Sequence, residues 1–173
     1  MSHKYFFAVW AAISMLLTSC KKDEYWGQMS ALKNGSLWEG KIKVEPTTFS
    51  SNKATIFIQT FDKGGFLTEN LFFFKVPTKI GTYNLSQTIN HPPDDSLTGC
   101  RYLNLSEDQL LDTFVIGSND STSYIEITEY NEGKGEIRGK FNVILWPEPG
   151  IPGSWNAPDS LVFSDGVFHT RIN

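Results

Sequence analysis

The sequence predicts an all-β protein, an antiparallel β-sandwich of about nine to eleven short strands. Three observations predict this fold: short runs of β-branched and aromatic residues recur along the chain, turn-forming residues separate them, and no amphipathic helix of any length interrupts them. An up-and-down β-barrel is the alternative architecture, because it has the same strand-and-turn pattern. Of the 173 residues, 40% are hydrophobic and 14% aromatic, which suits one globular domain.

The N-terminal segment is expected to be a targeting signal. Lys4 precedes an apolar run over residues 5–17, which is shorter than the roughly 20 residues of a transmembrane helix but suits a secretory signal. Leu17-Thr18-Ser19-Cys20 resembles the lipobox of bacterial lipoproteins, which implies acylation of the Cys20 thiol. An ordinary signal peptide with a chance cysteine is the alternative. We expect a signal peptide over 1–19, lipidated Cys20 with a tether over 20–30, and one β domain over 31–173.

Lipidation at Cys20 would determine where the protein resides. Two or three acyl chains, at about 0.8 kcal/mol for each buried CH₂, anchor a protein without a transmembrane helix. The residues from Cys20 to Glu24 (Cys-Lys-Lys-Asp-Glu) resemble the export signal of Bacteroidota surface lipoproteins, which implies the outer membrane and its outer face, with the periplasmic side as the alternative. The membrane is therefore an expected partner through the anchor.

The net charge and the cysteine content restrict which ligands and which covalent bonds are expected of the chain. Without Lys4 the chain has 14 basic and 19 acidic residues, about −5, so electrostatic binding of nucleic acid is not expected. With Cys20 acylated, only Cys100 remains, and no intrachain disulfide is possible. Cys100 is interpreted as a small residue at the start of a strand rather than as a reactive thiolate. The fold must then rest on its hydrophobic core.

The first strands follow from turn chemistry. Asn34-Gly35 predicts a two-residue hairpin, because this dipeptide accepts the positive φ angles of a type I′ turn. Residues 54–61 form a β-branched and aromatic run, and a turn at 62–65 separates it from a strand over 71–76. That second strand contains three consecutive phenylalanines, which cannot all face one side. Either both of its faces are covered, as the interpretation favours, or one ring is exposed for binding.

The middle of the chain predicts one short strand and two hairpins. Residues 81–85 form a short strand, and the strands 100–105 and 110–116 flank Ser106 to Gln109 as a hairpin, with one capped helical turn as the alternative. Residues 123–145 alternate in polarity with period two, which indicates an antiparallel hairpin with its turn at 131–135. The register expected there pairs Tyr130 with Glu136, Thr128 with Arg138, Glu126 with Lys140 and Ile125 with Phe141.

The C-terminal third begins with a stiff loop. Residues 146–159 contain four prolines and two glycines, a composition that no regular element accommodates. Two last strands are expected over 161–163 and 167–172, separated by a turn at Ser164-Asp165-Gly166.

Motifs for catalysis, metal binding or cofactors are not found in the sequence. His91 and His169 are the only histidines after the signal, so no sequence-adjacent zinc set is possible, and phosphate-binding loops and nucleophile elbows are missing. Glu126, Glu129 and Glu136 are interpreted as outward charges on a hairpin rather than as a glycosidase pair. The oxygen-rich groups Asn90 with Asp94-Asp95, and Asn119-Asp120, are interpreted as solvated loop residues rather than as Ca²⁺ ligands. We expect no enzyme, no metal and no cofactor.

Two tryptophans are the candidate binding residues. Trp146 and Trp155 bracket the proline-rich loop, and flat apolar rings held near a surface stack on sugars or on a protein partner at little entropic cost. The interpretation favours rings that fold back and cap an open end of the core, with binding as the alternative, and one tryptophan could do each.

A family resemblance supports the fold and the location. Its residues are Asn34-Gly35 with Trp38, Gly81-Thr82-Tyr83, the runs 125–130 and 137–141, and 165–168. With these patterns the chain resembles uncharacterised β-rich lipoproteins of Bacteroidota, a family that implies no catalytic residue. The function expected is a non-catalytic, surface-exposed module that binds glycan or protein. A structural or accessory subunit of an envelope complex is the alternative, followed by a small hydrolase.

Overall fold

The computed structural model describes residues 25–47, 52–86, 97–107, 109–118 and 120–172, and in these ranges it has eleven strands and no helix. The strands are β1 (Gly27–Lys33), β2 (Ser36–Glu39), β3 (Lys41–Pro46), β4 (Lys53–Phe61), β5 (Leu67–Pro77), β6 (Gly81–Ser86), β7 (Thr98–Ser106), β8 (Gln109–Ile116), β9 (Tyr124–Asn131), β10 (Glu136–Pro147) and β11 (Leu161–Arg171). The all-β prediction is confirmed.

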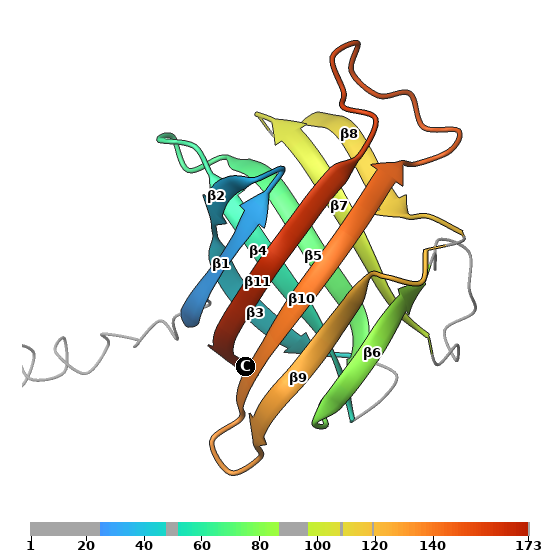
Figure 1. Cartoon of the computed structure of the whole chain (residues 1–173). Coiled ribbons are helices and arrows are strands. Elements are labelled where there is room, and N and C mark those ends of the chain that lie inside the picture. Colours follow the sequence, from blue (N-terminus) through green and yellow to red (C-terminus); the bar gives the residue numbers. More distant parts are fainter. Residues whose placement is uncertain (1–24, 48–51, 87–96, 108, 119, 173) are drawn as a thin grey trace, which may run out of the picture.

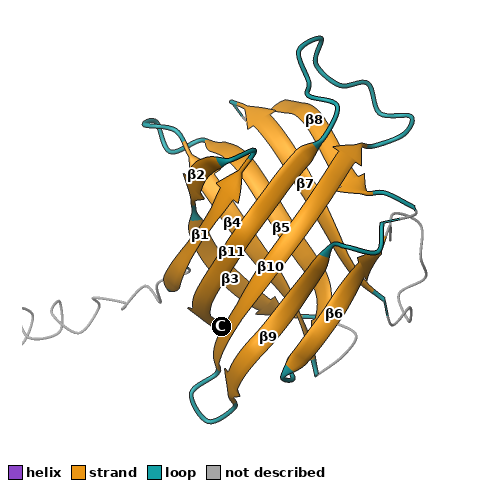
Figure 2. Ribbon diagram, viewed as in Figure 1, coloured by secondary structure: helices purple, strands orange, loops and turns teal. Residues whose placement is uncertain are grey.

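The strands form two facing layers (Figures 1 and 2). Along the hydrogen-bonded path the order is β2-β1-β11-β10-β9-β6-β7-β5-β4-β3, and β8 pairs with both β7 and β10. The near layer in Figure 1 runs from β1 through β11, β10 and β9 to β6, and the far layer contains β3, β4, β5, β7 and β8. The path ends at β2 and β3 instead of closing regularly, so the architecture agrees with a sandwich. One pair, β6 with β7, is parallel, which the antiparallel prediction did not include.

The first hairpin forms as its sequence predicts. Asn34 and Gly35 have φ angles of 48° and 80°, and β1 pairs antiparallel with β2. β1 already begins at Gly27, so residues 27–30, which were expected to be tether, belong to the sheet. After β2 the chain bends at Gly40 into β3 and so passes from one layer to the other. A side chain at Gly40 would approach the backbone oxygen of Gln59 to 3.0 Å, which explains why the bend has none.

The β9–β10 hairpin has the expected register far from its turn but not close to it. Glu126 faces Lys140 and Ile125 faces Phe141 as predicted, whereas Arg138 faces Glu129 instead of Thr128, and Glu136 faces Asn131 instead of Tyr130. The turn itself sets this difference: Lys134 and Gly135 donate backbone hydrogen bonds to residues 131 and 132, which makes Asn131 and Glu136 the closing pair. A bulge next to Gly139 takes up the extra residue and keeps the isoleucines in the core.

The last strand corrects a second expectation. Ser164-Asp165-Gly166 does not form a turn between two strands, because β11 runs without interruption from Leu161 to Arg171. Asp165 instead adopts a φ of 52° within a bulge of this strand. The bulge places Gly166 against the Phe141 ring, and a side chain added at position 166 would come within 2.5 Å of that ring. The aromatic ring thus covers the glycine across the strand pair.

Aromatic rings from both layers meet in the core. Phe73 of β5 and Phe141 of β10 lie 5.2 Å apart between ring centroids, and Trp38 and Phe163 lie 4.9 Å apart. Only the middle member of the three consecutive phenylalanines is buried: Phe73 is 0% exposed, while Phe72 and Phe74 are half-buried on the outer face. Neighbouring aromatic rings, rather than a second sheet, cover these two. The β7–β8 connection is the hairpin that the sequence favoured over a helical turn.

Candidate binding surface

Exposed apolar side chains gather at one end of the sandwich. Among the described residues eleven large apolar side chains are exposed, and seven of them lie at or beside the connections β1–β2, β4–β5, β7–β8 and β10–β11. All four connections lie at the top of the view in Figure 1. We call this set the apolar tip. Its members are Leu37, Phe66, Leu110, Leu111, Ile151, Trp155 and Val162.

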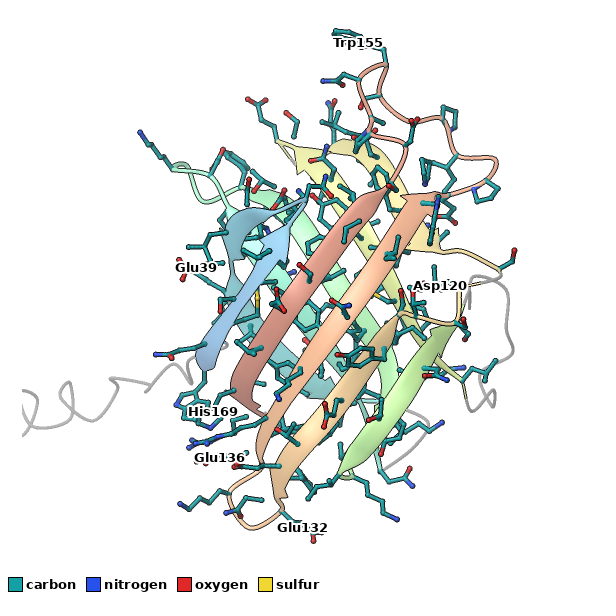
Figure 3. The ribbon with its side chains drawn as sticks, viewed as in Figure 1. Glu39, Asp120, Glu132, Glu136, Trp155 and His169 are labelled. Atoms are coloured by element: carbon teal, nitrogen blue, oxygen red, sulfur yellow. The ribbon has the colours of Figure 1, made fainter. Side chains whose placement is uncertain are left out.

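The chain enters the domain far from the β10–β11 loop of this tip. Gly27 pairs with Thr170 near one end of β11, while Leu161 at the other end follows the tip loop. An eleven-residue strand spans about 35 Å at about 3.3 Å per residue, so the first strand begins at the opposite end of the sandwich. The β9–β10 turn with Glu132 also lies at that opposite end, as Figure 3 shows. The Trp155 loop and the N-terminal entry point are therefore separate, whereas Phe66 of the tip lies five residues after Phe61, whose ring contacts Tyr25 near the entry point.

Trp155 is the most exposed member of the tip. Its exposed fraction is 97%, and Figure 3 shows the ring projecting away from the ribbon. The residues beside it are held: the amide and the hydroxyl of Ser154 donate to Asp112 Oδ1 at 2.6 and 2.7 Å, and the amide of Ala157 donates to the Ser154 carbonyl at 3.1 Å. The ring therefore stands on an anchored turn, and ordering it on binding costs little backbone entropy.

A second anchor fixes the base of the same loop. Glu148 is buried, its carboxylate pairs with Arg101 of β7, and its amide donates to the carbonyl of Thr113 at 2.9 Å. Pro149 and Gly150 then form a tight turn, closed by a 3.2 Å bond from the Ile151 amide to the Glu148 carbonyl. Gly150 has a φ of 83°, which the third residue of a type II turn requires. Anchors at Glu148 and Ser154 make the proline-rich loop stiff, as its composition predicts.

The buried carboxylate of Asp112 is the centre of the loop anchor. Besides the two bonds from Ser154 it accepts a third, at 2.8 Å, from the side-chain amide of Asn104. Burial raises the pKa of Asp112, but the hydrogen bonds from Asn104 and Ser154 outweigh burial and lower the pKa below its ordinary value. The carboxylate therefore stays ionised at neutral pH and holds the loop with charge-assisted bonds.

Trp146 belongs to a different surface. It is 39% exposed and lies over Gly117, where an added side chain would approach the indole ring to 3.1 Å. Together with Gly117, Ser118, Asp120, Ser121 and Thr122 it lines a shallow groove of about 430 Å³. The structure thus does not bring Trp146 and Trp155 into one site. Trp155 does not cap the core. Trp146 is partly buried, and the exposed part of its ring lines the groove.

Asp120 is the charged residue of this groove. Its carboxylate accepts hydrogen bonds from the amides of Thr122 and Ser123 and from both of their hydroxyls. Burial raises the pKa of Asp120, but these bonds outweigh it and lower the pKa. The carboxylate shapes the loop between β8 and β9. The groove therefore offers one aromatic face surrounded by small hydroxyl side chains, a combination that suits a sugar ring.

A polar cluster that the sequence did not predict connects the two layers below the apolar tip. The carboxylate of Glu69 accepts hydrogen bonds from Lys33, from the Trp38 indole, and from the Tyr102 hydroxyl at 2.8 Å. Burial raises the pKa of Glu69, but the ammonium of Lys33 and the three hydrogen bonds outweigh it and lower the pKa. Burial beside this anion raises the pKa of Tyr102, so its phenol stays protonated. The cluster ties β1 and β2 to β5 and β7 across the two layers.

The other sequence candidates do not converge. The Glu136 carboxylate lies 3.3 Å from Arg171 Nη2 and 3.8 Å from His169 Nε2. The Glu129 carboxylate lies 3.5 Å from Arg138 Nη1. No group of three His, Cys, Asp or Glu side chains suited to a metal occurs among the described residues. Cys100 is buried, which raises the pKa of its thiol well above the ordinary value. Several candidates lie outside the described residues: Cys20, Asn90, His91, Asp94, Asp95 and Asn119.

Comparisons with known proteins give this chain no relative. No family model, no curated protein and no solved structure matches it. In the part of the chain that the structure describes, no helix has the length and apolarity needed to cross a membrane. The functional assignment therefore rests on the surfaces described above.

Proposed function

We propose that the protein is a non-catalytic binding module, held to a membrane through acylated Cys20, that captures a protein partner with its apolar tip. The observation that carries this proposal is Trp155, a 97% exposed indole on a turn anchored through Ser154 and Asp112. Tryptophan is enriched among the residues that dominate binding energy, and anchored neighbours reduce the entropy lost when a partner covers the ring.

The surroundings of Trp155 support a protein rather than a sugar as its ligand. Six further exposed apolar side chains share its end of the sandwich, and apolar side chains gathered on one part of a surface mark protein interaction sites. If the partner is an envelope protein that stays bound, the chain is an accessory subunit and its apolar tip is permanently covered. The outer face of the outer membrane is the location that we propose, on the lipobox and the acidic segment behind it.

A second candidate function rests on a different observation. The groove beside Trp146 combines an exposed indole with the small hydroxyl residues Ser118, Ser121 and Thr122. Sugars bind proteins by stacking on such rings and by hydrogen bonding to polar neighbours, so we propose glycan as the ligand of this groove.

One binding experiment separates the two functions. The mature chain without its acyl group is tested against a panel of host and dietary glycans, and the acylated chain is tested against envelope proteins by crosslinking on intact cells, with Trp146→Ala and Trp155→Ala as the variants in both assays. Loss of glycan binding in Trp146→Ala alone supports the groove. Loss of crosslinking in Trp155→Ala alone supports the apolar tip. Retention of both activities in both variants would contradict both assignments.

The anchor is tested separately. Cys20→Ala prevents acylation, and the proposal predicts that this variant leaves the membrane fraction. Persistent membrane attachment would contradict the lipoprotein assignment without bearing on the apolar tip or the groove.

A further inference from the structure

The outer face of β3, β4 and β5 has a continuous strip of aromatic and lysine side chains. Inward positions on these strands are occupied by aliphatic residues and Phe73, and the alternate positions face outward. We call this surface the aromatic–lysine face. It consists of Tyr25, Lys41, Lys43, Phe57, Phe61, Phe72 and Phe74.

The rings of this face contact one another across the strands. Phe57 and Phe72 stack with ring centroids 6.0 Å apart, Phe72 and Phe74 lie 5.9 Å apart, and Tyr25 meets Phe61 edge-on at 5.9 Å. All five rings are half-buried, so each presents part of its surface to the outside. The strip is therefore a shallow aromatic surface rather than a pocket.

The two lysines lie among these rings. The Lys41 ammonium lies 5.5 Å from the Tyr25 ring centre and 5.1 Å from that of Phe61, and the Lys43 ammonium lies 5.3 Å from that of Phe57. The Glu45 carboxylate lies 3.1 Å from Lys43 and offsets part of this charge, and Arg101 of β7, which faces Phe72 across the strands, is already paired with the Glu148 carboxylate. The face keeps an excess of positive charge on a chain whose net charge is −4.

The N-terminal segment joins the domain at this same face. The hydroxyl of Tyr25 donates to the side-chain oxygen of Gln59 at 2.7 Å on the outer side of β4. Cys20 precedes Tyr25 by five residues, which span at most about 17 Å when fully extended. A lipid on Cys20 therefore keeps the aromatic–lysine face close to the membrane, whereas the β10–β11 loop with Trp155 lies at the other end of β11, a strand about 35 Å long.

We propose that the aromatic–lysine face rests on the lipid surface to which Cys20 holds the chain. This inference rests on the proposed lipid anchor. Aromatic rings favour the boundary between headgroups and acyl chains, and lysines extend their ammonium groups to anionic headgroups while their stems contact the rings. Docking in this way orients the domain. The outer face of β10 and β11 then points away from the membrane, and the loop with Trp155 stays accessible at the side.

Depth-dependent labelling tests the orientation. The acylated protein is extracted from cells and reconstituted into vesicles of phosphatidylethanolamine and phosphatidylglycerol, with a spin label on Thr55→Cys in the far layer or on Asn142→Cys in the near layer. Cys100 is 2% exposed and does not compete for the label. We expect the label at 55, between Glu45 and the phenylalanines, to be several-fold less accessible to a water-soluble relaxation agent than the label at 142.

Charge variants provide the matched comparison. The double variant Lys41→Glu with Lys43→Glu should remove the difference between the two labels, and Lys134→Glu, on the β9–β10 turn, should not. Both labels could prove equally accessible in a protein that sediments with the vesicles only when Cys20 is present. That result would overturn the docking face but would support the lipid anchor.

Two other outcomes overturn the proposal in different ways. Failure of the protein to sediment with vesicles in a Cys20-dependent manner would remove the anchor and the docking face with it. Protection of the label at 55 in solution, together with the mass of a dimer, would show instead that the aromatic–lysine face binds a second copy of the chain.

Discussion

Replacing Asp112 by alanine is expected to detach the proline-rich loop without unfolding the sandwich. The carboxylate accepts two hydrogen bonds from Ser154, at 2.6 and 2.7 Å, and it is 3% exposed. Hydrogen bonds to a charged group contribute about 1.5–3 kcal/mol each, so the lower figure gives about 3 kcal/mol for the pair and about a hundredfold rise in the detached population.

Hydrogen exchange of the Ser154 amide measures this population directly. At pH 7 we expect exchange to be about a hundredfold faster in Asp112→Ala, and about tenfold faster in Ser154→Ala, which loses only the hydroxyl bond. Asp159→Ala, which removes an exposed carboxylate from the same loop, is the control and should leave the rate unchanged. Equal exchange rates in Asp112→Ala and Asp159→Ala would refute the anchored-loop account.

The pH dependence has a definite sign. The folded state lowers the pKa of Asp112, so the anchor is fully present above the ordinary aspartate pKa of about 4 and is lost as the pH falls through the lowered value. Wild type and Asp112→Ala should therefore converge in acid, once the difference in intrinsic exchange is taken into account.

Three further changes test other parts of the structure. Glu69→Gln should lower the free energy of unfolding by about 1.5 kcal/mol at pH 7, because it leaves the half-buried Lys33 ammonium without its carboxylate partner; since the Glu69 pKa is lowered, this difference should shrink as urea titrations are moved to low pH. Trp155→Ala should leave the thermal midpoint unchanged, whereas Trp38→Ala should cost about 3–5 kcal/mol, and an equal effect of the two would contradict the exposure assigned to Trp155. Gly166→Ala should cost about 1–3 kcal/mol in calorimetry because its side chain would meet the aromatic ring across the strand, and a neutral result would rule out that close contact.

Local chemistry explains which parts of the fold the sequence predicts correctly. Asn34-Gly35 makes its turn because both residues accept positive φ angles, and Ile125 and Phe141 face the core because the alternation leaves no other register there. Ser164-Asp165-Gly166 has the same kind of turn composition, yet it forms a bulge, since the flanking residues pair with β10 on both sides. Turn residues predict a local backbone shape, and strand pairing decides whether the chain reverses.

The binding surface was only partly predictable for a related reason. The proline-rich loop and its tryptophans are evident in the sequence, and the structure separates them into the exposed Trp155 and the groove residue Trp146. Four members of the apolar tip come from three other connections, and only the strand order places them at one end: Leu37, Phe66, Leu110 and Leu111. Glu69 was missed because its partners Lys33 and Tyr102 are distant in sequence and give no local pattern.

The most direct test of the central claim is site-specific photocrosslinking on intact cells. A photoreactive residue replaces Asn156, next to the intact Trp155, or Glu132 at the opposite end of the sandwich. The account predicts a discrete protein adduct from position 156 that disappears when Trp155→Ala is added, and no such adduct from position 132. Adducts of equal yield from both positions, or an adduct at 156 that survives Trp155→Ala, would contradict the assignment of the apolar tip as the partner-binding surface.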